Sequence, residues 1–389
     1  MRKRKILFIS TNRADYNIQK KIISTLVRNN KNSVSLIITG THLSKQFGFT
    51  KTNLSTHKIK KIIIKNLIKS DNRESILDCI SAGIKKFKKI IKKSSPDLMV
   101  LIGDRYEIFS IAICCLFLKI KIAHIHGGEI TAGSFDEQIR HSISKMSHLH
   151  FVVHQKYKER LIQMGEDKKK IFNYGSPSLD YIKHTKILNI NTLSKKYNFD
   201  FSNKYFLVCY HAATNNAKNS IKDLKILLKS INKINDVKFI FTYPNPDPNY
   251  SRIIDELKKF TRKNKQKYTL IKNFGSINFF SAIYHSCGII GNSSSGIIEV
   301  PIFRLPTINI GNRQEGREQS SSIINCDFNE KDIINKIKYV MTNKFLKSIK
   351  KDNAIFYKKN ASEKIAKKIE TEAFKKNSIK KFNDLNLKL

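Results

Sequence analysis

Two carboxylates in the first half of the chain stand where acid–base chemistry could take place. Asp104 lies in the sequence Gly-Asp-Arg-Tyr-Glu and Glu129 ends the sequence His-Ile-His-Gly-Gly-Glu, each after a mainly apolar run. The runs Leu98–Ile102 and Ile120–Ala123 predict buried parallel strands. Open α/β sheets bind ligands at the carboxyl ends of their strands, so we expect both carboxylates to face one crevice. Paired carboxylates suit general acid–base catalysis, which predicts an enzyme.

A third carboxylate, Asp136, follows Glu129 closely and stands at the start of a predicted helix whose apolar face is Ile139, Ile143 and Met146. Asp136 and Arg140 are one helical turn apart, so they share a face of that helix. We expect Asp136 to assist the other two carboxylates rather than only to begin the helix. Arg140 is expected to orient carboxylates.

Three histidines lie near predicted strand ends. His124 and His126 alternate at strand spacing, which could indicate a metal pair. The alternative is a pair of hydrogen-bonded or site-lining side chains, and because no further ligand spacing supports a metal we predict none. His211 directly follows the predicted strand Phe206–Tyr210 and is predicted to bind substrate.

A Ser/Gly-rich turn in the second half predicts a phosphate site. The segment Gly-Asn-Ser-Ser-Ser-Gly-Ile-Ile-Glu, which ends at Glu299, follows the predicted strand Gly288–Ile290. Its glycines allow close backbone approach and its hydroxyls and amides supply donors, so we expect Ser294, Ser295 and Gly296 to contact phosphate. Glu299 is expected to accept hydrogen bonds from ribose hydroxyls.

Two arginines add cations at other predicted strand ends. Arg13 follows the first strand, where a guanidinium suits a diphosphate, and Arg313 lies in the later segment Gly311–Arg317. The spacing fits neither a P-loop nor a dinucleotide fingerprint. The pattern predicts nucleotide binding without NAD chemistry or ATP hydrolysis.

Strand-like runs alternate with amphipathic helical stretches along the chain, which predicts an α/β fold with two doubly wound, Rossmann-like domains. The predicted strands are Ile6–Ile9, Val34–Ile38, Ile62–Ile64, Leu98–Ile102, Ile122–Ile125, Leu149–Val153, Phe206–Tyr210, Phe239–Tyr243, Tyr268–Ile271, Gly288–Ile290 and Thr307–Ile310. We expect an N-terminal domain over residues 1–178, a nucleotide-binding domain over 179–360, and a basic helix or tail over 361–389.

Composition narrows the class of protein. The net charge of +42 could indicate nucleic-acid binding, but most basic residues are Lys spread over nearly every helix-like segment. That distribution favours a solvated surface, so we predict no dedicated nucleic-acid partner. The six cysteines show no metal-type pairing and are expected to be reduced. The start of the chain lacks the apolar length of a signal peptide, and no run would span a membrane, so we expect a cytoplasmic protein.

The polar segments also resemble, in order, those of the hydrolysing UDP-N-acetylglucosamine 2-epimerases of sialic-acid-type sugar synthesis. The matching blocks are Arg13–Tyr16, Gly103–Arg105, His124–Glu129, Asp136–His141, Gly165–Glu166, Gly291–Glu299 and Gly311–Arg317. The resemblance implies a glycosyltransferase-B-like fold, with two domains facing a cleft and UDP bound mainly by the C-terminal half. The chain departs from the family pattern at Thr11, where Gly is usual, and at Ala212, where Pro is usual.

The resemblance implies the reaction UDP-N-acetylglucosamine plus water to N-acetylmannosamine and UDP, through a 2-acetamidoglucal. Asp104, Glu129 and Asp136 would be the catalytic carboxylates, and which one removes the C2 proton stays open. Arg13 and His211 would hold the diphosphate. No cofactor is implied, and the partners would be the UDP-sugar and further copies of the chain in a dimer or tetramer.

Three other functions stay open at the level of sequence. The first is the same reaction on UDP-2,4-diacetamido-2,4,6-trideoxyglucose, as in legionaminic-acid synthesis. The second is a non-hydrolysing UDP-GlcNAc 2-epimerase, and the third is a glycosyltransferase on the same fold.

Overall fold

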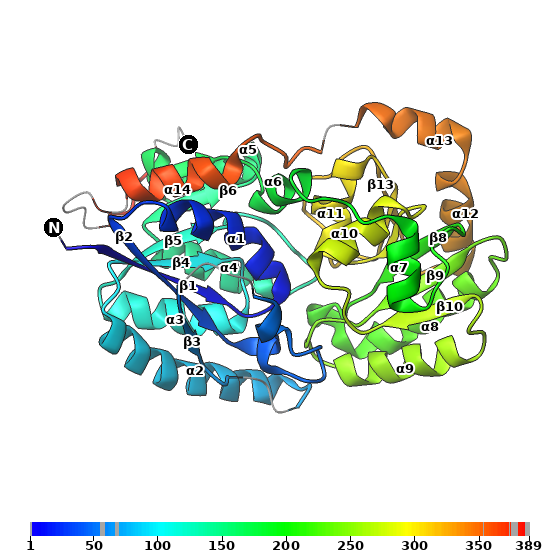
Figure 1. Cartoon of the computed structure of the whole chain (residues 1–389), viewed down its shortest axis with the longest axis horizontal. Helices are drawn as coiled ribbons and strands as arrows, with labels where there is room; N and C mark the ends of the chain where they lie inside the picture. The colour runs from blue at the N-terminus through cyan, green and yellow to red at the C-terminus, as the bar shows by residue number, and fades with distance from the viewer. Residues whose placement is uncertain are drawn as a thin grey trace. The chain divides into compact units, whose positions relative to one another are not determined.

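The computed structural model describes residues 2–54, 59–66, 70–352, 354–372, 374 and 380–385. The chain forms two compact units (Figure 1). Unit 1 comprises Met1–Glu129, Asp136–Tyr181 and Phe356–Leu389, and unit 2 comprises Ile130–Phe135 and Ile182–Ile355. Each unit is built on one parallel sheet with helices, which confirms the predicted α/β class with two doubly wound domains.

The sheet of unit 1 has seven parallel strands in the order β3-β2-β1-β4-β5-β6-β7. Its strands are β1 (Arg4–Ser10), β2 (Asn32–Ile38), β3 (Lys60–Ile63), β4 (Leu98–Ile102), β5 (Lys121–Ile125), β6 (Leu149–Val152) and β7 (Ile171–Asn173). The central strand β4 is buried along its whole length, as its continuous apolar sequence requires. This rigid sheet carries Arg13, Asp104 and Glu129 beyond its strand ends.

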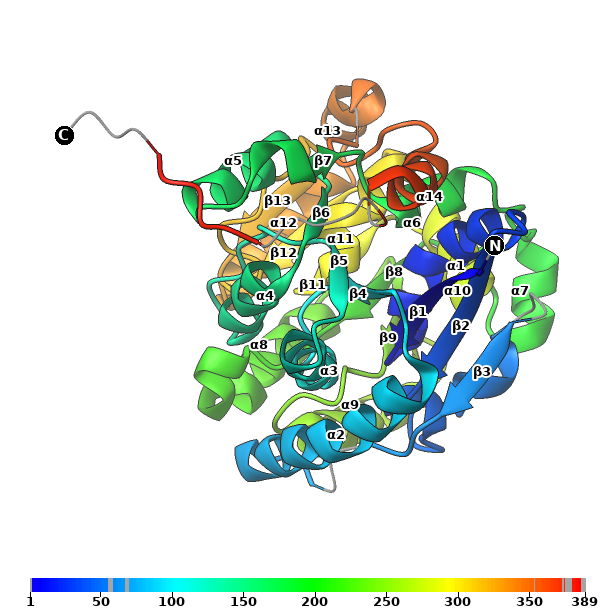
Figure 2. The ribbon, with the colours of Figure 1, turned by 90° about the vertical axis from the view of Figure 1, so that its left-hand side faces the viewer.

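Helices cover both faces of this sheet. Its helices are α1 (Arg13–Val27), α2 (Arg73–Ser94), α3 (Tyr106–Phe117), α4 (Asp136–Met146), α5 (Gln155–Gln163), α6 (Pro177–Lys183) and α14 (Ala361–Glu372). Ile22 of α1 and Ile365 of α14 share one hydrophobic core with Phe8, and Figure 1 shows these two helices side by side. Phe87 of α2 and Ile143 of α4 belong to a second core on the other face (Figure 2).

Unit 2 repeats this architecture with six parallel strands in the order β10-β9-β8-β11-β12-β13. The strands are β8 (Tyr205–Cys209), β9 (Lys238–Thr242), β10 (Tyr268–Ile271), β11 (Ile289–Gly291), β12 (Thr307–Ile310) and β13 (Ile323–Cys326). The helices are α7 (Ile190–Tyr197), α8 (Ser220–Asn232), α9 (Tyr250–Arg262), α10 (Ser276–Tyr284), α11 (Ser294–Ile298), α12 (Glu330–Val340) and α13 (Asn343–Ser348). One apolar core joins α8, α9 and α12 to the sheet, while the hydroxyls of Tyr205 and Thr307 donate to α10 and α11 on the other face.

Short turns of 3-10 helix complete the chain at Gly40–Leu43, Thr50–Asn53, Lys168–Lys170, Thr214–Asn219, Val300–Phe303 and Ile349–Lys351. None of the helices in the described ranges combines the length and apolar character of a membrane span.

Both sheets reverse their strand order at one point, which locates the ligand crevice of such folds. In unit 1 the reversal lies between β1 and β4, and in unit 2 it lies between β8 and β11. The chain therefore delivers Arg13 and Asp104 to one switch point, and His211 and Ser294 to the other.

Two segments belong to other units than the expected domain ranges 1–178, 179–360 and 361–389 imply. The expected C-terminal helix is present as α14, and it packs into unit 1 because Ile365, Ala366 and Ile369 form an apolar stripe that α1 covers. Residues 130–135, between Glu129 and Asp136, belong to unit 2.

Candidate active site

In unit 1, Arg13 and Asp104 both lie just past the strands that flank the switch point. Arg13 is the first residue of α1, half-buried, and Asn12 caps that helix by accepting from the backbone amide of Asp15. Gly103 turns the chain after β4 with a φ of +67°, a conformation that favours glycine. The turn projects Asp104 beyond the sheet edge with its side chain about one-fifth exposed.

Arg140 connects the loops that carry the two predicted carboxylates. Its guanidinium is 2% exposed; it donates to the backbone oxygen of Glu129 at 2.7 Å and pairs with the carboxylate of Asp104. Burial by itself would lower the pKa of Arg140, but the negative charges of Asp104 and Glu129 outweigh it and raise the pKa. One buried cation thus joins both loops, which agrees with the expectation that Arg140 orients carboxylates.

His124 is a neutral structural side chain between the Asp104 loop and α4. Burial lowers its pKa to about 3, so the ring carries no charge at neutral pH. Nε2 lies 2.8 Å from the carbonyl oxygen of Gly103 and must donate to it; Nδ1, 3.1 Å from the hydroxyl of Ser144, then accepts. This contact holds Gly103, and with it the adjacent Asp104, in place.

His126 makes a different contact from His124. It lies one residue past β5 with a φ of +67°, so it does not continue the strand on which both rings would point to the same side. Its Nδ1 lies 2.6 Å from Oε1 of Glu129, and both side chains are buried. Among the described residues, no group of three or more metal-ligating side chains gathers around either histidine or elsewhere.

Asp136 is the first residue of α4, and its negative charge acts on Arg140. The predicted apolar face of this helix is present, since Ile143 is fully buried and Ile139 and Met146 pack on the same core. The helix therefore brings Asp136 toward the cation that also holds Asp104 and the Glu129 loop.

In unit 2, His211 is held at the end of β8 by Asn292, which follows β11. The Asn292 side chain accepts from the amide of His211 and donates to its carbonyl oxygen, both at 2.8 Å. The Nδ1 atom of His211 accepts from the amide of Asn245 at 3.0 Å. The neutral ring therefore carries its proton on Nε2, which makes that atom the donor.

The Ser/Gly-rich turn begins with Gly291, whose φ is +137°. A side chain there would place a Cβ 2.2 Å from the carbonyl oxygen of Cys209, so the position requires glycine. Ser293 caps α11 by accepting from the amide of Ser295, and Ser294 and Ser295 are half-buried in its first turn. Because α11 has only five residues, its dipole is small, and amides and hydroxyls are the main donors.

Gly296 and Glu299 lie further along the same turn. A Cβ on Gly296 would meet Thr307 at 2.7 Å, so this glycine has a packing reason that does not involve a ligand. Glu299 is the C-terminal cap of α11 and is half-buried. Their predicted contacts with phosphate and ribose stay predictions.

Arg313 is buried and engaged with its own unit. Its guanidinium donates to the carbonyl oxygens of Ala212 at 3.3 Å and Asn292 at 3.1 Å, and lies 3.7 Å from the carboxylate of Asp247. These contacts tie the ends of β8, β11 and β12 together. Its predicted role in binding substrate stays a prediction, and the contacts describe an organising side chain.

The segment 130–135 is fastened to the same loops of unit 2. The amide of Ala132 donates to the carbonyl oxygen of Glu315, and the hydroxyl of Ser134 lies 2.9 Å from that of Thr214. Gly133 is required because a Cβ there would lie 2.6 Å from Cα of Arg313. The chain between Glu129 and Asp136 is therefore held by the loops around His211 and Arg313.

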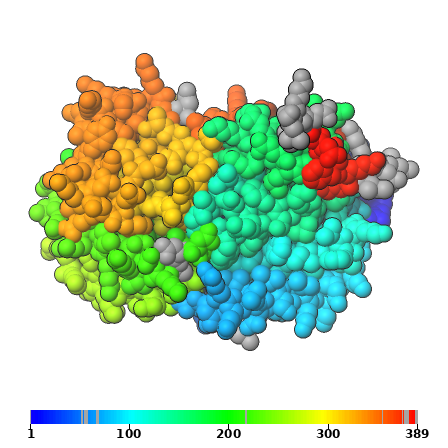
Figure 3. All heavy atoms as spheres, turned by 180° about the vertical axis from the view of Figure 1, so that it is seen from behind, coloured from blue at the N-terminus to red at the C-terminus, as the bar shows by residue number. Residues whose placement is uncertain are grey.

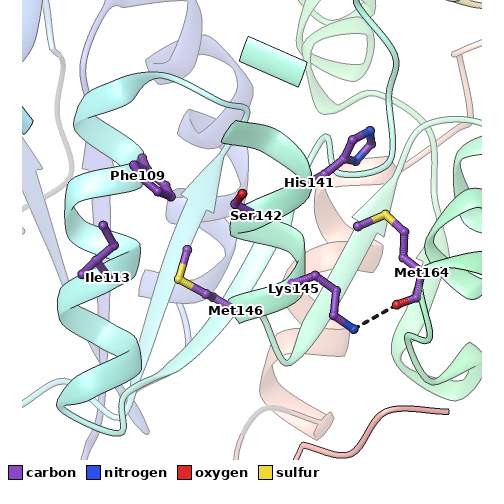
Figure 4. A pocket seen from close by; sticks show the side chains of 7 residues that line it. All are labelled: Phe109, Ile113, His141, Ser142, Lys145, Met146 and Met164. Carbon is purple, nitrogen blue, oxygen red and sulfur yellow. Dashed lines mark hydrogen bonds between the residues drawn. The ribbon is translucent and has the colours of Figure 1, made fainter. Parts of the chain in front are cut away.

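A surface cavity of unit 1 lies apart from these residues. It has a volume of about 490 Å³ and is lined by side chains of α3 and α4 together with Met164 (Figure 4). Lys145 at its rim donates to the carbonyl oxygen of Met164 at 2.9 Å. The lining includes none of the predicted catalytic or binding residues.

The sequence does not predict three contacts that organise these sites. His126 is expected to be hydrogen-bonded or site-lining, but the sequence does not name Glu129 as its partner, although its place three residues before Glu129 could have suggested the contact. Asn292 and Asp247 gave no signal, because their partners lie far away along the chain.

With this geometry established, comparison with known proteins identifies the family. The chain matches the UDP-N-acetylglucosamine 2-epimerase family over residues 24–370. A Campylobacter jejuni protein named GDP/UDP-N,N'-diacetylbacillosamine 2-epimerase (hydrolyzing) is 40% identical over 334 residues, which cover 85% of this chain and 86% of the relative. The UDP-N,N'-diacetylbacillosamine 2-epimerase (hydrolyzing) of Legionella pneumophila is 31% identical over 328 residues, 83% of this chain and 85% of the relative.

The fold has counterparts among solved structures. The crystal structure of UDP-GlcNAc 2-epimerase from Neisseria meningitidis bound to UDP-GlcNAc has a TM-score of 0.79 at 17% sequence identity, covering 94% of this chain and 99% of that one. This similarity supports the predicted glycosyltransferase-B-like class of the two units. Because the family match and both relatives span most of its length, the chain belongs to the UDP-N-acetylglucosamine 2-epimerase family.

Proposed function

We propose that the protein is a hydrolysing 2-epimerase that converts UDP-N,N'-diacetylbacillosamine and water into 2,4-diacetamido-2,4,6-trideoxymannose and UDP. N,N'-diacetylbacillosamine is 2,4-diacetamido-2,4,6-trideoxyglucose, the alternative substrate considered from the sequence. The observation that carries the choice is the 40% identity, over 85% of the chain, to a relative that is named for this sugar and for hydrolysis. The second relative is also named for the UDP form of this sugar and for hydrolysis.

The carboxylates of unit 1 would do the chemistry. In the first proposed step a base removes the proton on C2 while the C1–oxygen bond breaks, which releases UDP and leaves a 1,2-unsaturated sugar. In the second step water adds at C1, its proton passes to a base, and an acid returns a proton to C2 from the opposite face. Asp104, Glu129 and Asp136 supply these acids and bases, since all three belong to the group organised by Arg140.

Charge stabilisation is the other proposed task of these carboxylates. When the C1–oxygen bond breaks, positive charge develops at C1, and anionic side chains held in fixed positions stabilise it. Arg140 is buried and holds Asp104 in place through their ion pair. Little reorganisation of the carboxylate therefore accompanies the reaction.

Unit 2 would bind the nucleotide. Ser294, Ser295 and the backbone around Gly296 donate to phosphate, Glu299 accepts from ribose hydroxyls, and Arg313 organises the loops. His211 would donate from Nε2 to the departing diphosphate, because its Nδ1 is an acceptor for the Asn245 amide. Arg13 keeps its predicted role, in which its guanidinium binds diphosphate.

The second candidate is the same reaction on UDP-N-acetylglucosamine, which the name of the family supports. Incubation with each UDP-sugar in D2O, followed by proton NMR, separates the candidates. We expect UDP and the free manno-configured diacetamido sugar with deuterium at C2, and slower turnover of UDP-N-acetylglucosamine. The GDP form of the diacetamido sugar belongs in the same series, because one relative is named for both nucleotides.

Each alternative has its own product. Faster turnover of UDP-N-acetylglucosamine would reverse the order of the two candidates. A product that keeps UDP would identify a non-hydrolysing epimerase, and transfer of the sugar to an added acceptor would identify a glycosyltransferase. We also propose that the chain forms a dimer or tetramer, which a solution mass that is a multiple of 45.0 kDa would support.

A further inference from the structure

The contact between His126 and Glu129 has a geometry that the proposed carboxylate chemistry does not by itself explain. Nδ1 of His126 lies 2.6 Å from Oε1 of Glu129. His126 is 6% exposed and Glu129 is 2% exposed. A hydrogen bond from an imidazole to a carboxylate inside a protein is strong, because water does not compete for either group.

His126 lies at a turn whose backbone conformation is held by a hydrogen bond. Its φ of +67° lies in the left-handed region, which residues other than glycine seldom adopt, with His, Asn and Asp the commonest exceptions. The backbone is anchored there by the amide of His126, which donates to the carbonyl oxygen of Phe151 at 3.0 Å.

The remaining ring nitrogen identifies the proton-bearing atom. Nε2 of His126 is buried and has no hydrogen-bond partner among the residues that the structure describes. A proton on Nε2 would be a buried donor without an acceptor, whereas a proton on Nδ1 reaches the Glu129 carboxylate directly. Nδ1 of His126 therefore carries a proton and donates it to Glu129.

We infer that His126 is a positioning residue that holds the Glu129 carboxylate in one orientation and in its ionised form. This inference rests on the proposed function, because it gives Glu129 a role in the reaction. Arg140 fixes the backbone of Glu129 through its carbonyl oxygen, and His126 fixes the side chain. A carboxylate that acts on a sugar ring needs both, since a small misplacement of a catalytic group costs much of the rate.

Two replacements of His126 separate the effect of the hydrogen bond on activity from the effect of the backbone conformation. Asn places its amide nitrogen at the position of Nδ1 and, like Gly, accepts a positive φ. His126→Gly keeps the backbone conformation and removes the donor, so we expect kcat to fall about ten- to hundredfold while KM changes little. His126→Asn should restore most of that loss.

The pH dependence of kcat/KM is a further test, because it would not change if His126 only stabilised the fold. A hydrogen bond to the ionised form of Glu129 favours that form, so its removal shifts the Glu129 limb of the kcat/KM profile to higher pH. We expect this shift in His126→Gly and not in His126→Asn. Glu129→Gln serves as the reference for complete loss of the carboxylate.

The outcomes distinguish this inference from the proposed function. Normal turnover and an unmoved limb in His126→Gly, with kcat of Glu129→Gln lowered about a hundredfold, would overturn the inference and leave the function intact. An Asn variant as slow as the Gly variant would also overturn it, because the donor would then not be what matters. If the wild type turns over none of the sugar nucleotides, the proposed function fails instead.

The hydrogen bond itself can be tested without turnover. In protein with nitrogen-15-labelled histidine, the signals absent from His126→Asn belong to His126, one of 11 histidines in the chain. We expect those signals to show a ring protonated on Nδ1. Protonation on Nε2 alone would contradict the contact, whatever the activity.

Discussion

At the scale of single residues, the site of unit 1 is a group of anions arranged around one buried cation. Arg140 carries a charge that burial would penalise heavily if it stood alone. Its pairing with Asp104 and its bond to the Glu129 carbonyl offset that cost and fix both loops. The carboxylates are therefore positioned before any substrate arrives.

Replacing either predicted carboxylate by its amide should remove acid–base catalysis and leave nucleotide binding intact. We expect Asp104→Asn and Glu129→Gln each to lower kcat about a hundredfold, the usual scale for an acid or base. Turnover is measured by UDP release, and UDP affinity by calorimetry. Asp255→Asn, on an exposed part of α9, is the matched control. Near-normal rates in both site variants would argue against their catalytic role.

The residues that the sequence singles out and the contacts that it does not predict differ in how far along the chain the partners lie. Asp104, Glu129 and Arg140 were predicted because each follows a recognisable strand or shares a helix face with a neighbour. The pairing of His211 with Asn292 spans 81 positions along the chain, and that of Arg313 with Ala212 spans 101. Such contacts form because the strand order brings distant loops together. A local sequence pattern does not specify that order.

At the scale of elements, the apolar runs of the central strands were sufficient to locate them. The predicted bounds of β4 and β12, and of the more apolar edge strand β10, agree with the structure, while β7 and β13 were missed. Both missed strands lie at a sheet edge, where one side lacks a neighbouring strand. An edge strand can be short and partly polar, so its sequence resembles that of a loop.

The turn after β11 should depend on Gly291 for its shape. Gly291→Ala would combine a strained φ with a Cβ 2.2 Å from the Cys209 carbonyl oxygen. We expect a loss of stability of more than about 1 kcal/mol and weaker UDP binding. Thermal unfolding and calorimetry with UDP measure the two effects.

Gly275 provides the matched control for that substitution. Its φ of +71° is also unfavourable for Ala, but a Cβ there would meet only the Asn278 side chain, at 3.8 Å. Gly275→Ala should therefore show the cost of the backbone conformation alone and leave UDP affinity unchanged. Equal effects of the two substitutions would contradict the importance of the contact with Cys209.

The C-terminal segment 380–385 lies against unit 1 (red in Figure 3), where the amide of Asn383 donates to the carbonyl oxygen of Gly165 at 3.0 Å. The buried carboxylate of Glu166 also holds this segment. Glu166, whose side chain is 3% exposed, binds Lys380 at 2.5 Å, Lys145 at 2.8 Å and His150 at 2.9 Å. Burial alone would raise the pKa of Glu166. The hydrogen bonds from these three groups outweigh burial and lower the pKa to about 2.

This shift predicts a stability contribution that depends on pH. The folded pKa of about 2 lies below the ordinary value of 4.5, so the contribution is present above pH 4.5 and is lost as the pH falls toward 2. We expect Lys380→Met to lower the free energy of unfolding at pH 7 by about 1–3 kcal/mol, and to lower it less at pH 3.5. Urea unfolding at both pH values measures this, with exposed Lys381→Met as control. An equal loss at both pH values would contradict the role of the Glu166 charge.

At the scale of the whole molecule, the excess of 73 basic over 31 acidic residues creates a positive field around the protein. The proposed substrate carries a diphosphate, whereas the product sugar is neutral. The field should therefore raise the rate of encounter with substrate without holding the sugar product. Electrostatic attraction of the substrate requires neither a nucleic-acid partner nor a focused patch of basic residues.

The field predicts a specific salt dependence of catalysis. Raising the ionic strength from about 0.02 M to 0.5 M shortens the Debye length from roughly 20 Å to about 4 Å, so long-range attraction is screened. We expect kcat/KM for the sugar nucleotide to fall several-fold over this range, while kcat at saturation stays nearly constant. Stopped assays of UDP release at each salt concentration measure both. Repeating the series with a different monovalent salt separates screening from specific ion binding. A kcat/KM that does not depend on ionic strength would show that the lysine surface plays no part in substrate capture.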